Sequence, residues 1–429
     1  MENKKTVGYW SAVSIGIGGM VGGGIFAVLG LAVNLSHGGA PIAFLIAGMV
    51  ALVTAYSYSK LSVTFPSSGG TVEFLNQGLG TGVLTGGLNI LLWISYVVML
   101  SLYSYAFGSY GATFFPDESQ TFWRHVLTSG AIISFTLLNF LSAKIIGKSE
   151  EIIVLIKIVI LVTFVAIGFW SVQFDKFEPS TWSPPIALMA GGMIIFLAYE
   201  GFELIANTAG DVKNPKKILP RAFYTAVLFV IGLYVMVSIV TVGNLSLDKI
   251  VESQDFALAE SAKPFLGHVG FVIIAIAALF STGSAINATL YGASRISYII
   301  AKTGELPTHL ERKIWNRPVE GLIITSISTL IIANLFDLAS IAVMGSAGFL
   351  LIFAAVNFAN FRLYKKTYSK KWISLIGCIV CFMALGVLVW ESNLTSPENI
   401  WIFVVMVGLA FTIEIIYRKI SKRRHKCSF

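Results

Sequence analysis

Three ionisable residues lie inside long apolar segments of this sequence: Lys157, Glu200 and Glu203. A charged side chain at bilayer depth is costly, so an intramembrane ionisable residue indicates a functional site by default. The two carboxyl groups belong to the stretch "FLAYEGFE", on either side of Gly201, whereas the lysine lies alone in the preceding apolar segment. These three residues are therefore the first candidates for chemistry within a membrane.

A second unusual feature is the stretch "GIGGMVGGGIF", which begins at Gly16 and lies within an otherwise apolar run. Glycine costs roughly 1 kcal/mol relative to alanine in a helix interior, so the cluster predicts that the helix unwinds near Met20–Ile25. Backbone groups released there would cost several kcal/mol each in hydrocarbon unless a bound solute satisfied them. Free N–H groups at a half-helix start suit a carboxylate, and free carbonyls at a half-helix end suit an ammonium. Two such breaks side by side would therefore bind a zwitterion.

Membrane-spanning helices must position these residues. Of the 429 residues, 56% are hydrophobic and only 12% are charged, which excludes a soluble domain of this size. Apolar runs of about 20 residues, long enough to span a bilayer, recur along the chain. We predict twelve spans, at approximately 8–34, 40–64, 83–114, 126–144, 151–173, 184–209, 221–243, 269–297, 319–336, 339–362, 372–390 and 399–418. The long amphipathic break at 244–268 predicts a short surface helix outside the membrane.

The distribution of lysine and arginine predicts the orientation of the spans. If the N-terminus is cytoplasmic, the outer breaks hold only Arg124, Lys176, Lys249 and Lys263. Lys157 lies inside a span, and the other 25 of the 30 basic residues fall on the cytoplasmic side. We therefore expect a multi-pass protein of the cytoplasmic (inner) membrane with both termini in the cytoplasm. The net charge of +8 indicates a membrane face and not a nucleic-acid partner.

Other classes of site are not expected. Cys378 and Cys381 form a CxxC pair within an apolar segment that has no other ligand nearby, so we interpret them as packing residues and predict no metal site. The sequence has no GxxxxGK[ST] motif, so ATP is not the energy source. A multi-span membrane enzyme remains a distant alternative, because the five histidines are scattered over loops and the tail. A channel would need repeated pore-lining residues, which are absent.

The spans with broken centres are the first and the sixth. Because five spans separate the start of one from the start of the other, the two segments should cross the bilayer in opposite directions. This offset is what an inverted repeat of five plus five helices predicts. We therefore expect one polytopic domain over 1–429, with repeat one at about 8–173, repeat two at about 184–362 and two further helices at about 372–418.

Several motifs resemble those of the amino acid–polyamine–organocation (APC) permeases. "GIGGMVGGGIF" and "FLAYEGFE" are similar to the signatures of the first and sixth helices of that family. "FPSSGG", "NPKKILPRA" and "NATLYGASRISYIIAKTGELP" resemble family segments after the second helix, after the sixth and within the eighth, in the right order. The resemblance implies an all-α membrane protein with twelve transmembrane helices in the LeuT-type 5+5 inverted-repeat fold, with helices 1 and 6 broken. It also implies uptake or exchange of amino acids or amines, with no enzymatic activity.

The resemblance also implies roles for residues at the two breaks. The backbone of the first break would donate to the carboxylate of the substrate, and carbonyls of the sixth helix would accept from its amino group, with Phe196 and Tyr199 as lids. The implied substrate site comprises Val21, Gly22, Gly23, Gly24, Ile25, Phe196, Ala198, Tyr199, Glu200 and Gly201. Leu197 stands where many exchangers for arginine, agmatine or polyamines carry tryptophan, which argues against those substrates. The aromatic residues favour a neutral or apolar side chain, but a cationic amino acid is favoured if Glu200 faces the pocket and does not simply bond to the loose end of helix one.

Lys157 matches the lysine in the fifth helix of proton-coupled family members, where the ammonium takes the place of a sodium ion between helices one and eight. Ser281, Thr282 and Ser284 would be its neighbours, and Glu203 matches an acidic residue linked to coupling. Because burial disfavours the charged form of a lysine, Lys157 could bind and release a proton. The alternative is that Lys157 snorkels to the cytoplasmic face. We expect no cofactor, and we expect the proton, not sodium, as coupling ion.

The leading hypothesis is a secondary active transporter that moves amino acids by alternating access, with proton-coupled symport as the mode. An amino acid or polyamine exchanger is the alternative. The expected partners are a small amino acid and the lipid bilayer. The identity of the substrate, the choice between symport and exchange, and the oligomeric state stay open at this point.

Overall fold

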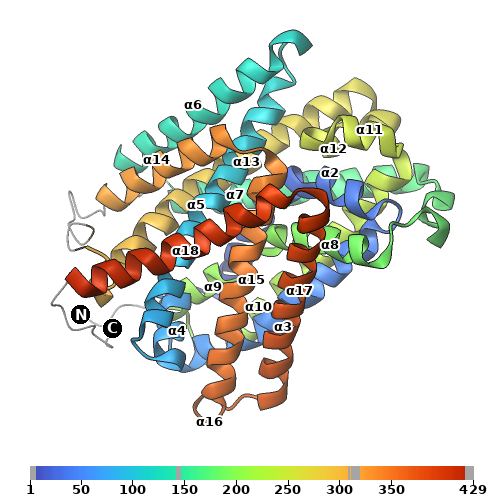
Figure 1. Ribbon diagram of the computed structural model, residues 1–429. Helices are drawn as coiled ribbons and strands as arrows, with labels where there is room; N and C mark the ends of the chain where they lie inside the picture. The colour runs from blue at the N-terminus through green and yellow to red at the C-terminus, as the bar shows by residue number, and fades with distance from the viewer. Residues whose placement is uncertain (1–5, 142–145, 308–309, 311–318, 421–429) are drawn as a thin grey trace.

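The computed structural model describes residues 6–141, 146–307, 310 and 319–420. Within these ranges the regular structure is helical, apart from two isolated bridges between extended residues. The helices of nine or more residues are α1 (Tyr9–Met20), α2 (Gly24–Ser36), α3 (Ala40–Thr64), α4 (Thr71–Leu79), α5 (Val83–Ala112), α6 (Gln120–Leu141), α7 (Ile146–Gly168), α8 (Pro185–Ile195), α10 (Pro215–Asn244), α13 (Lys263–Thr303), α14 (Val319–Leu335), α15 (Leu338–Arg362), α17 (Lys371–Thr395) and α18 (Pro397–Ile420). The shorter α-helices are α9 (Leu204–Asn207), α11 (Leu247–Glu252), α12 (Ala257–Glu260) and α16 (Tyr364–Thr367). Figure 1 shows them as one helical bundle.

The helices correspond to the twelve predicted spans. Among the described residues, nine spans are long and apolar enough to cross a membrane, one of which runs through α8 and α9, and α1 with α2 makes a tenth that is bent by 47°. The remaining two are α14, which is shorter, and α6, whose first turns carry Arg124 and His125. In Figure 1, α6 and α14 run side by side at the upper left. The all-α membrane fold with broken first and sixth spans is confirmed.

Several span boundaries differ from the prediction. The fourth span starts at Gln120, six residues early, and its predicted end at 142–144 lies outside the described residues. The eighth span extends beyond 269–297 at both ends, with a bend at Gly267, whose φ of 63° suits glycine. The break at 244–268 holds α11 and α12, as predicted, whereas α4 was not predicted as a helix.

The two broken spans lie antiparallel, because each end of one bridges to an end of the other. Val7, before α1, bridges to Val212, which follows the sixth span, and His37, after α2, bridges to Trp182, which precedes α8. The opposite directions predicted from the five-span offset are therefore confirmed. The exact repeat boundaries stay a prediction. We call the face near Val7 and Val212 the termini side, and the face near His37 and Trp182 the opposite side.

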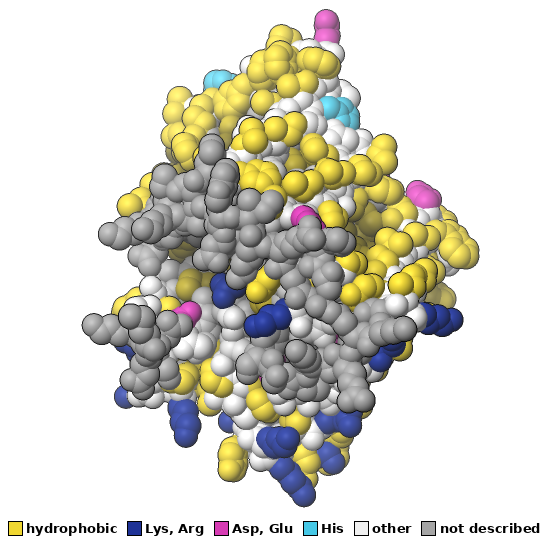
Figure 2. All heavy atoms as spheres, turned by 90° about the vertical axis from the view of Figure 1, so that its left-hand side faces the viewer, with side chains coloured by type: hydrophobic (Ala, Val, Ile, Leu, Met, Phe, Trp, Pro, Cys, Tyr) yellow, Lys and Arg dark blue, Asp and Glu magenta, His cyan; other side chains and the backbone are white. Residues whose placement is uncertain are grey.

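Charged residues are distributed unequally between these two faces. Figure 2 shows lysine and arginine side chains gathered over the lower part of the molecule, below a largely apolar upper part. On the opposite side, Arg124 lies 3.8 Å from Asp255, Lys263 lies 2.6 Å from Glu260, and Lys176 donates to the carbonyl of Leu245. The cations expected on this side are thus close to acidic or carbonyl oxygens of the loops there.

A buried polar network joins α3, α15 and α17. The Asn357 amide oxygen accepts from Ser57 at 2.7 Å, and its nitrogen donates to Thr54 at 3.1 Å. Cys381 of the CxxC pair contacts the Thr54 hydroxyl at 3.5 Å and is fully buried. In a membrane, interhelical hydrogen bonds of this kind stabilise helix association. The network therefore holds α15 and α17 against α3.

We predict that Asn357→Leu, which keeps the side-chain volume but removes both bonds, lowers the free energy of unfolding by about 1–3 kcal/mol. Thermal unfolding of the detergent-solubilised protein measures the change. Asn393→Leu, at an exposed position of α17, is the matched control and should leave stability unchanged. Equal stability of both variants would show that the network does not hold the helices together.

Candidate transport site

The first break separates α1 from α2 at residues 21–23. α1 ends at Met20 and α2 begins at Gly24 without a side-chain cap on its first N–H groups. In the sixth span, α8 ends at Ile195 and continues as a 3₁₀ turn, after which Glu200 is extended and Gly201 has φ 120°. Only glycine adopts that value of φ readily, so Gly201 is required where the span changes direction.

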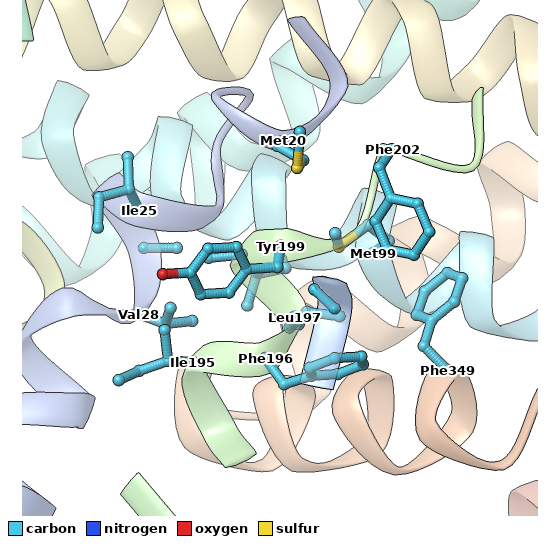
Figure 3. Packing of buried hydrophobic residues seen from close by; sticks show 14 of the residues in the cluster. Met20, Ile25, Val28, Met99, Ile195, Phe196, Leu197, Tyr199, Phe202 and Phe349 are labelled. Carbon is cyan, nitrogen blue, oxygen red and sulfur yellow. The ribbon is translucent and has the colours of Figure 1, made fainter. Parts of the chain in front are cut away.

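The two breaks are in direct contact, and this contact explains why glycines are needed. A Cβ atom at Gly24 would lie 2.7 Å from the Cα atom of Ala198, and a Cβ atom at Gly201 would overlap the backbone of Gly19. Any larger residue at Gly24 or Gly201 would push the two spans apart. Figure 3 shows the surrounding cluster, in which Ile25 and Val28 of the first span lie beside Ile195 and Tyr199 of the sixth.

Side chains from three other spans donate to the carbonyls near the first break. The Tyr234 hydroxyl of α10 donates to Met20 at 2.7 Å and lies 3.3 Å from the carbonyl of Ala198. The Ser281 hydroxyl of α13 bonds to the carbonyls of Val21, at 3.1 Å, and Gly22. Lys157 of α7 donates to the carbonyl of Gly18 at 3.1 Å. These bonds satisfy acceptors that would otherwise be unpaired inside the membrane.

Glu203 performs the equivalent task for the second break. One carboxylate oxygen accepts from the Gly201 N–H at 2.7 Å, and the other accepts from the Tyr96 hydroxyl of α5 at 3.0 Å. Glu203 is fully buried, and the carboxyl group of Glu200 lies beside it within hydrogen-bonding reach. Two carboxyl groups this close at this depth disfavour each other's charged form, so a proton shared between them leaves a single negative charge next to the broken helices.

A cavity of about 350 Å³ lies between the two breaks, α5 and α13. Its inner wall includes Gly19, Tyr103 and Glu200, and Ala285 and Thr289 of α13 complete the sides. Ser68, Asn207, Thr208 and Arg295, which lie toward the termini side, also line it. The cavity therefore reaches from the breaks toward the termini side.

Contacts close the path toward the opposite side. The Tyr110 hydroxyl of α5 donates to the carbonyl of Phe26 at 3.0 Å, and the two rings meet edge to face. Further along α2, Gly30 packs directly on the backbone of Gln254, in the loop between α11 and α12. The chain is thus open on one side of the breaks and closed on the other.

The predicted substrate residues are brought together, but only two of them line this cavity: Glu200 and Gly201. The other eight are buried beyond its inner wall: Val21, Gly22, Gly23, Gly24, Ile25, Phe196, Ala198 and Tyr199. Tyr199 donates to the carbonyl of Phe44 at 2.9 Å, and Phe196 packs edge to face on Phe353. In this state neither aromatic ring covers the cavity as a lid.

The predicted coupling residues divide in a similar way. Lys157 and Ser281 both contact the first span, Lys157 in α1 before the break and Ser281 in the break itself. Thr282 instead bonds to the carbonyl of Ala278 in its own helix, and Ser284 is half-buried on α13. Sequence reasoning missed Tyr234 as a donor to both breaks. Only its place in a buried span could have indicated it, because tyrosine usually pairs its hydroxyl when buried.

We predict that Gly24→Ala separates the two breaks at a cost of about 1–3 kcal/mol, while membrane insertion stays normal. Binding of substrate should fall with it. Gly232→Ala is the matched control, because a Cβ atom there meets nothing within 4 Å. Surface expression, thermal unfolding and equilibrium binding measure the three properties. A Gly24→Ala protein with the stability and affinity of the control would contradict the contact as the basis of the site.

Comparison with known proteins agrees with this geometry. The family model described as "Amino acid permease" matches residues 7–411. An uncharacterized protein of Methanocaldococcus jannaschii, MJ0609, is 37% identical over 99% of this chain and 97% of its own length. The inner membrane transport protein YbaT of Escherichia coli is 36% identical over 98% and 97%, and the branched-chain amino acid permease BcaP of Lactococcus lactis is 25% identical over 96% and 94%. With its broken first and sixth spans meeting at a one-sided cavity, the chain belongs to the amino acid permease family within the APC superfamily and has the LeuT-type all-α fold of that group.

Proposed function

We propose that this permease takes up amino acids by alternating access, driven by a proton gradient. The observation that carries the proposal is the one-sided cavity that ends at the contact between the two broken spans. A solute bound there is reached from the termini side and is blocked from the opposite side by Tyr110 and the loop around Gln254. We place the termini side in the cytoplasm of a cell whose inner membrane holds the protein, because the lysine and arginine bias favours that orientation.

The substrate carboxylate binds at the start of α2, and the ammonium binds at Glu200. α2 has 13 residues and no side-chain cap, so the positive end of its dipole and its free N–H groups suit an anion. Glu200 lines the cavity and is the acidic residue of the described part of its wall. An α-amino acid placed between them spans the two breaks.

The position of Glu200 favours a substrate that carries a second positive charge. Glu200 faces the cavity next to Glu203, whereas the aromatic residues expected to select an apolar side chain, Phe196 and Tyr199, do not. A negative region of this kind favours a cationic amino acid over a neutral one. The relatives include both the branched-chain amino acid permease BcaP and the cationic amino acid transporter 7 of Arabidopsis thaliana, which is 24% identical over 97% of this chain and 76% of its own length.

We predict that arginine or lysine competes with labelled substrate more strongly than leucine or alanine does in proteoliposomes. Glu200→Gln should weaken competition by leucine, because Glu200 binds the ammonium of every α-amino acid, and should weaken competition by the cationic pair at least tenfold more, the equivalent of about 1.4 kcal/mol. Thermal unfolding of the detergent-solubilised variant is the control for folding. If leucine competes better than arginine in both proteins, the substrate is neutral and Glu200 does not read a cationic side chain.

Coupling rests on Lys157. Lys157 is 3% exposed, and its ammonium donates to the Gly18 carbonyl, two residues before the end of α1. Ser281 of α13 donates to the same span within its break. When protonated, Lys157 holds α1 against α7. When it loses the proton, only the weaker bond of a neutral amine remains, α1 can move, and the substrate is released toward the termini side.

We predict sodium-independent uptake that an inward proton gradient accelerates, and that Lys157→Ala abolishes the acceleration but retains binding. The control is Lys60→Ala, which removes an exposed lysine on the termini side and should keep the response. Uptake of labelled substrate with imposed proton or sodium gradients is the measurement. Strict sodium dependence, or an unchanged proton response in Lys157→Ala, would contradict the mechanism. Uptake that requires amino acid on the far side of the membrane would instead identify an exchanger.

A further inference from the structure

A second group of buried ionisable residues lies on the termini side, away from Lys157. Glu305 follows the end of α13 directly and is 1% exposed. It faces polar residues of α4, α5 and α18, and we call the set the Glu305 cluster: Asn76, Asn89, Thr303, Glu305, Glu414 and Arg418. None of these residues belongs to the site proposed for the substrate or for coupling.

Hydrogen bonds in the cluster join three helices through one amide group. Asn89 of α5 donates from its amide nitrogen to Glu305 at 2.7 Å and to the Asn76 oxygen of α4 at 3.2 Å. Thr303 lies 3.4 Å from the same carboxylate oxygen of Glu305. A negatively charged Glu305 thus ties the end of α13 to α5, and through Asn89 to α4.

The cluster has an excess of buried negative charge and unused acceptors. Glu414 of α18 is fully buried, bonds to Arg418 through one oxygen at 2.9 Å and leaves the other oxygen without a partner. The guanidinium of Arg418 bonds to Glu414 and to the carbonyl of Thr81, and it acts on Glu305 only through its charge. The amide oxygen of Asn89, whose side chain is fully buried, and the hydroxyl of Thr85 have no partner either. A proton on the cluster would compensate the charge and supply a missing donor.

The cluster is connected to the mouth of the cavity. Arg295 and Ile299, on the last turns of α13 before Glu305, line the cavity, as does Ser68, just before α4. Gly70, between Ser68 and α4, packs on the side chain of Asn207, which also lines the mouth. Movement of α4 or of the end of α13 therefore changes the opening on the termini side.

We propose that Glu305 is a proton-binding site, separate from Lys157, whose charge controls the hydrogen bonds that join α13, α5 and α4 around the cavity mouth. When charged, Glu305 accepts from the Asn89 nitrogen, as seen here. When a proton arrives from the termini side, the new hydroxyl of Glu305 donates to the Asn89 oxygen after the amide group turns over. The Asn89 nitrogen then leaves Asn76, and α4 is released. No atoms other than this proton are gained or lost.

The environment of Glu305 supports titration near neutral pH. Burial and the Glu414 charge raise the pKa of this carboxyl group, whereas the hydrogen bonds from Asn89 and Thr303 and the charge of Arg418 lower it, and the net pKa is about 7, above the ordinary 4.5. Glu414 and Arg418, both on α18, are the charged groups that act on it, Asn89 of α5 is its polar partner, and Asn76 of α4 is bonded to Asn89. The charged, tied form is therefore favoured as the pH on the termini side rises.

The test is to follow the carboxylic-acid infrared band of the purified full-length protein as the pH is raised. We expect a band that disappears with a midpoint near pH 7 and is missing from Glu305→Gln. Asn89→Leu, which removes a donor, should shift the midpoint upward, and Glu414→Gln, which removes a negative neighbour, should shift it downward. Glu252→Gln, at an exposed position on the opposite side, should leave it unchanged.

Stability gives a second readout with a defined sign. Because the pKa of Glu305 is higher in the folded protein, the folded state holds a proton that the unfolded chain has lost between the two values. The unfolding constant should then rise by up to about tenfold per pH unit from about pH 4.5 to about pH 7 and level off above, and Glu305→Gln should lose this component. A band that persists in Glu305→Gln, or that shifts the same way in Asn89→Leu and Glu414→Gln, would overturn the proposal. Lys157→Ala should keep the midpoint, so failure of the coupling mechanism is distinguishable from failure here.

Discussion

Every backbone polar group inside a membrane needs a partner, and the two broken spans are where this chain cannot supply one from within a helix. The other spans near the breaks are placed so that their side chains meet that need. Tyr234 reaches carbonyls of both breaks, and Ser281 reaches the two carbonyls that follow Met20. Glu203 receives the loose N–H of Gly201. The positions of α10 and α13 relative to the first span follow from this requirement.

The same requirement links charge to helix position. A hydroxyl satisfies a loose carbonyl permanently, whereas an ammonium that loses its proton becomes a neutral amine, which is a weaker donor. Lys157 is the one donor to the first span, among those described, whose strength as a donor depends on its charge. Under the proposed coupling, its protonation changes how firmly α1 is held, whereas the bonds of Tyr234 and Ser281 stay the same in either state. A transporter that must move one broken helix while keeping the other fixed needs such a difference between its donors.

The main features of the fold could be predicted from the sequence, because a membrane restricts the possibilities. Apolar runs of span length are unmistakable, and the glycines and carboxylates at the centres of spans one and six mark the two breaks. The helix α4 was missed because its nine residues are too few and too polar to stand out as a span, although their pattern is amphipathic. The start of α6 was misplaced because Arg124, which lies near the Tyr105 hydroxyl and Asp255, looks like a residue outside a helix.

The wall of the cavity could not be predicted, for a different physical reason. α5 and α13 are buried over much of their surface, so neither sequence has a distinct polar face. The sequence therefore does not indicate which face of each helix contacts the first span. The contributions of Tyr103 and Thr289 depend on helix rotation, which packing decides and a single sequence does not encode. The orientation of the Tyr199 side chain could not be predicted either. Its hydroxyl donates to the backbone carbonyl of Phe44, and every residue has a backbone carbonyl.

The packing of Gly22 and Gly23 explains why the N–H groups at the first break do not line the cavity in this structure. Gly23 packs directly on the ring of Tyr103, and Gly22 lies close to Ala285, so the start of α2 is sealed from the space beside Glu200. A substrate whose ammonium has reached Glu200 can place its carboxylate on α2 only if Tyr103 and Gly23 separate. That separation moves α5 relative to the first span, about two helical turns before Tyr110 of the same helix, which closes the opposite side through Phe26. Under the proposed binding mode, occupying the whole site weakens the closed side, and the two openings are coupled through one helix.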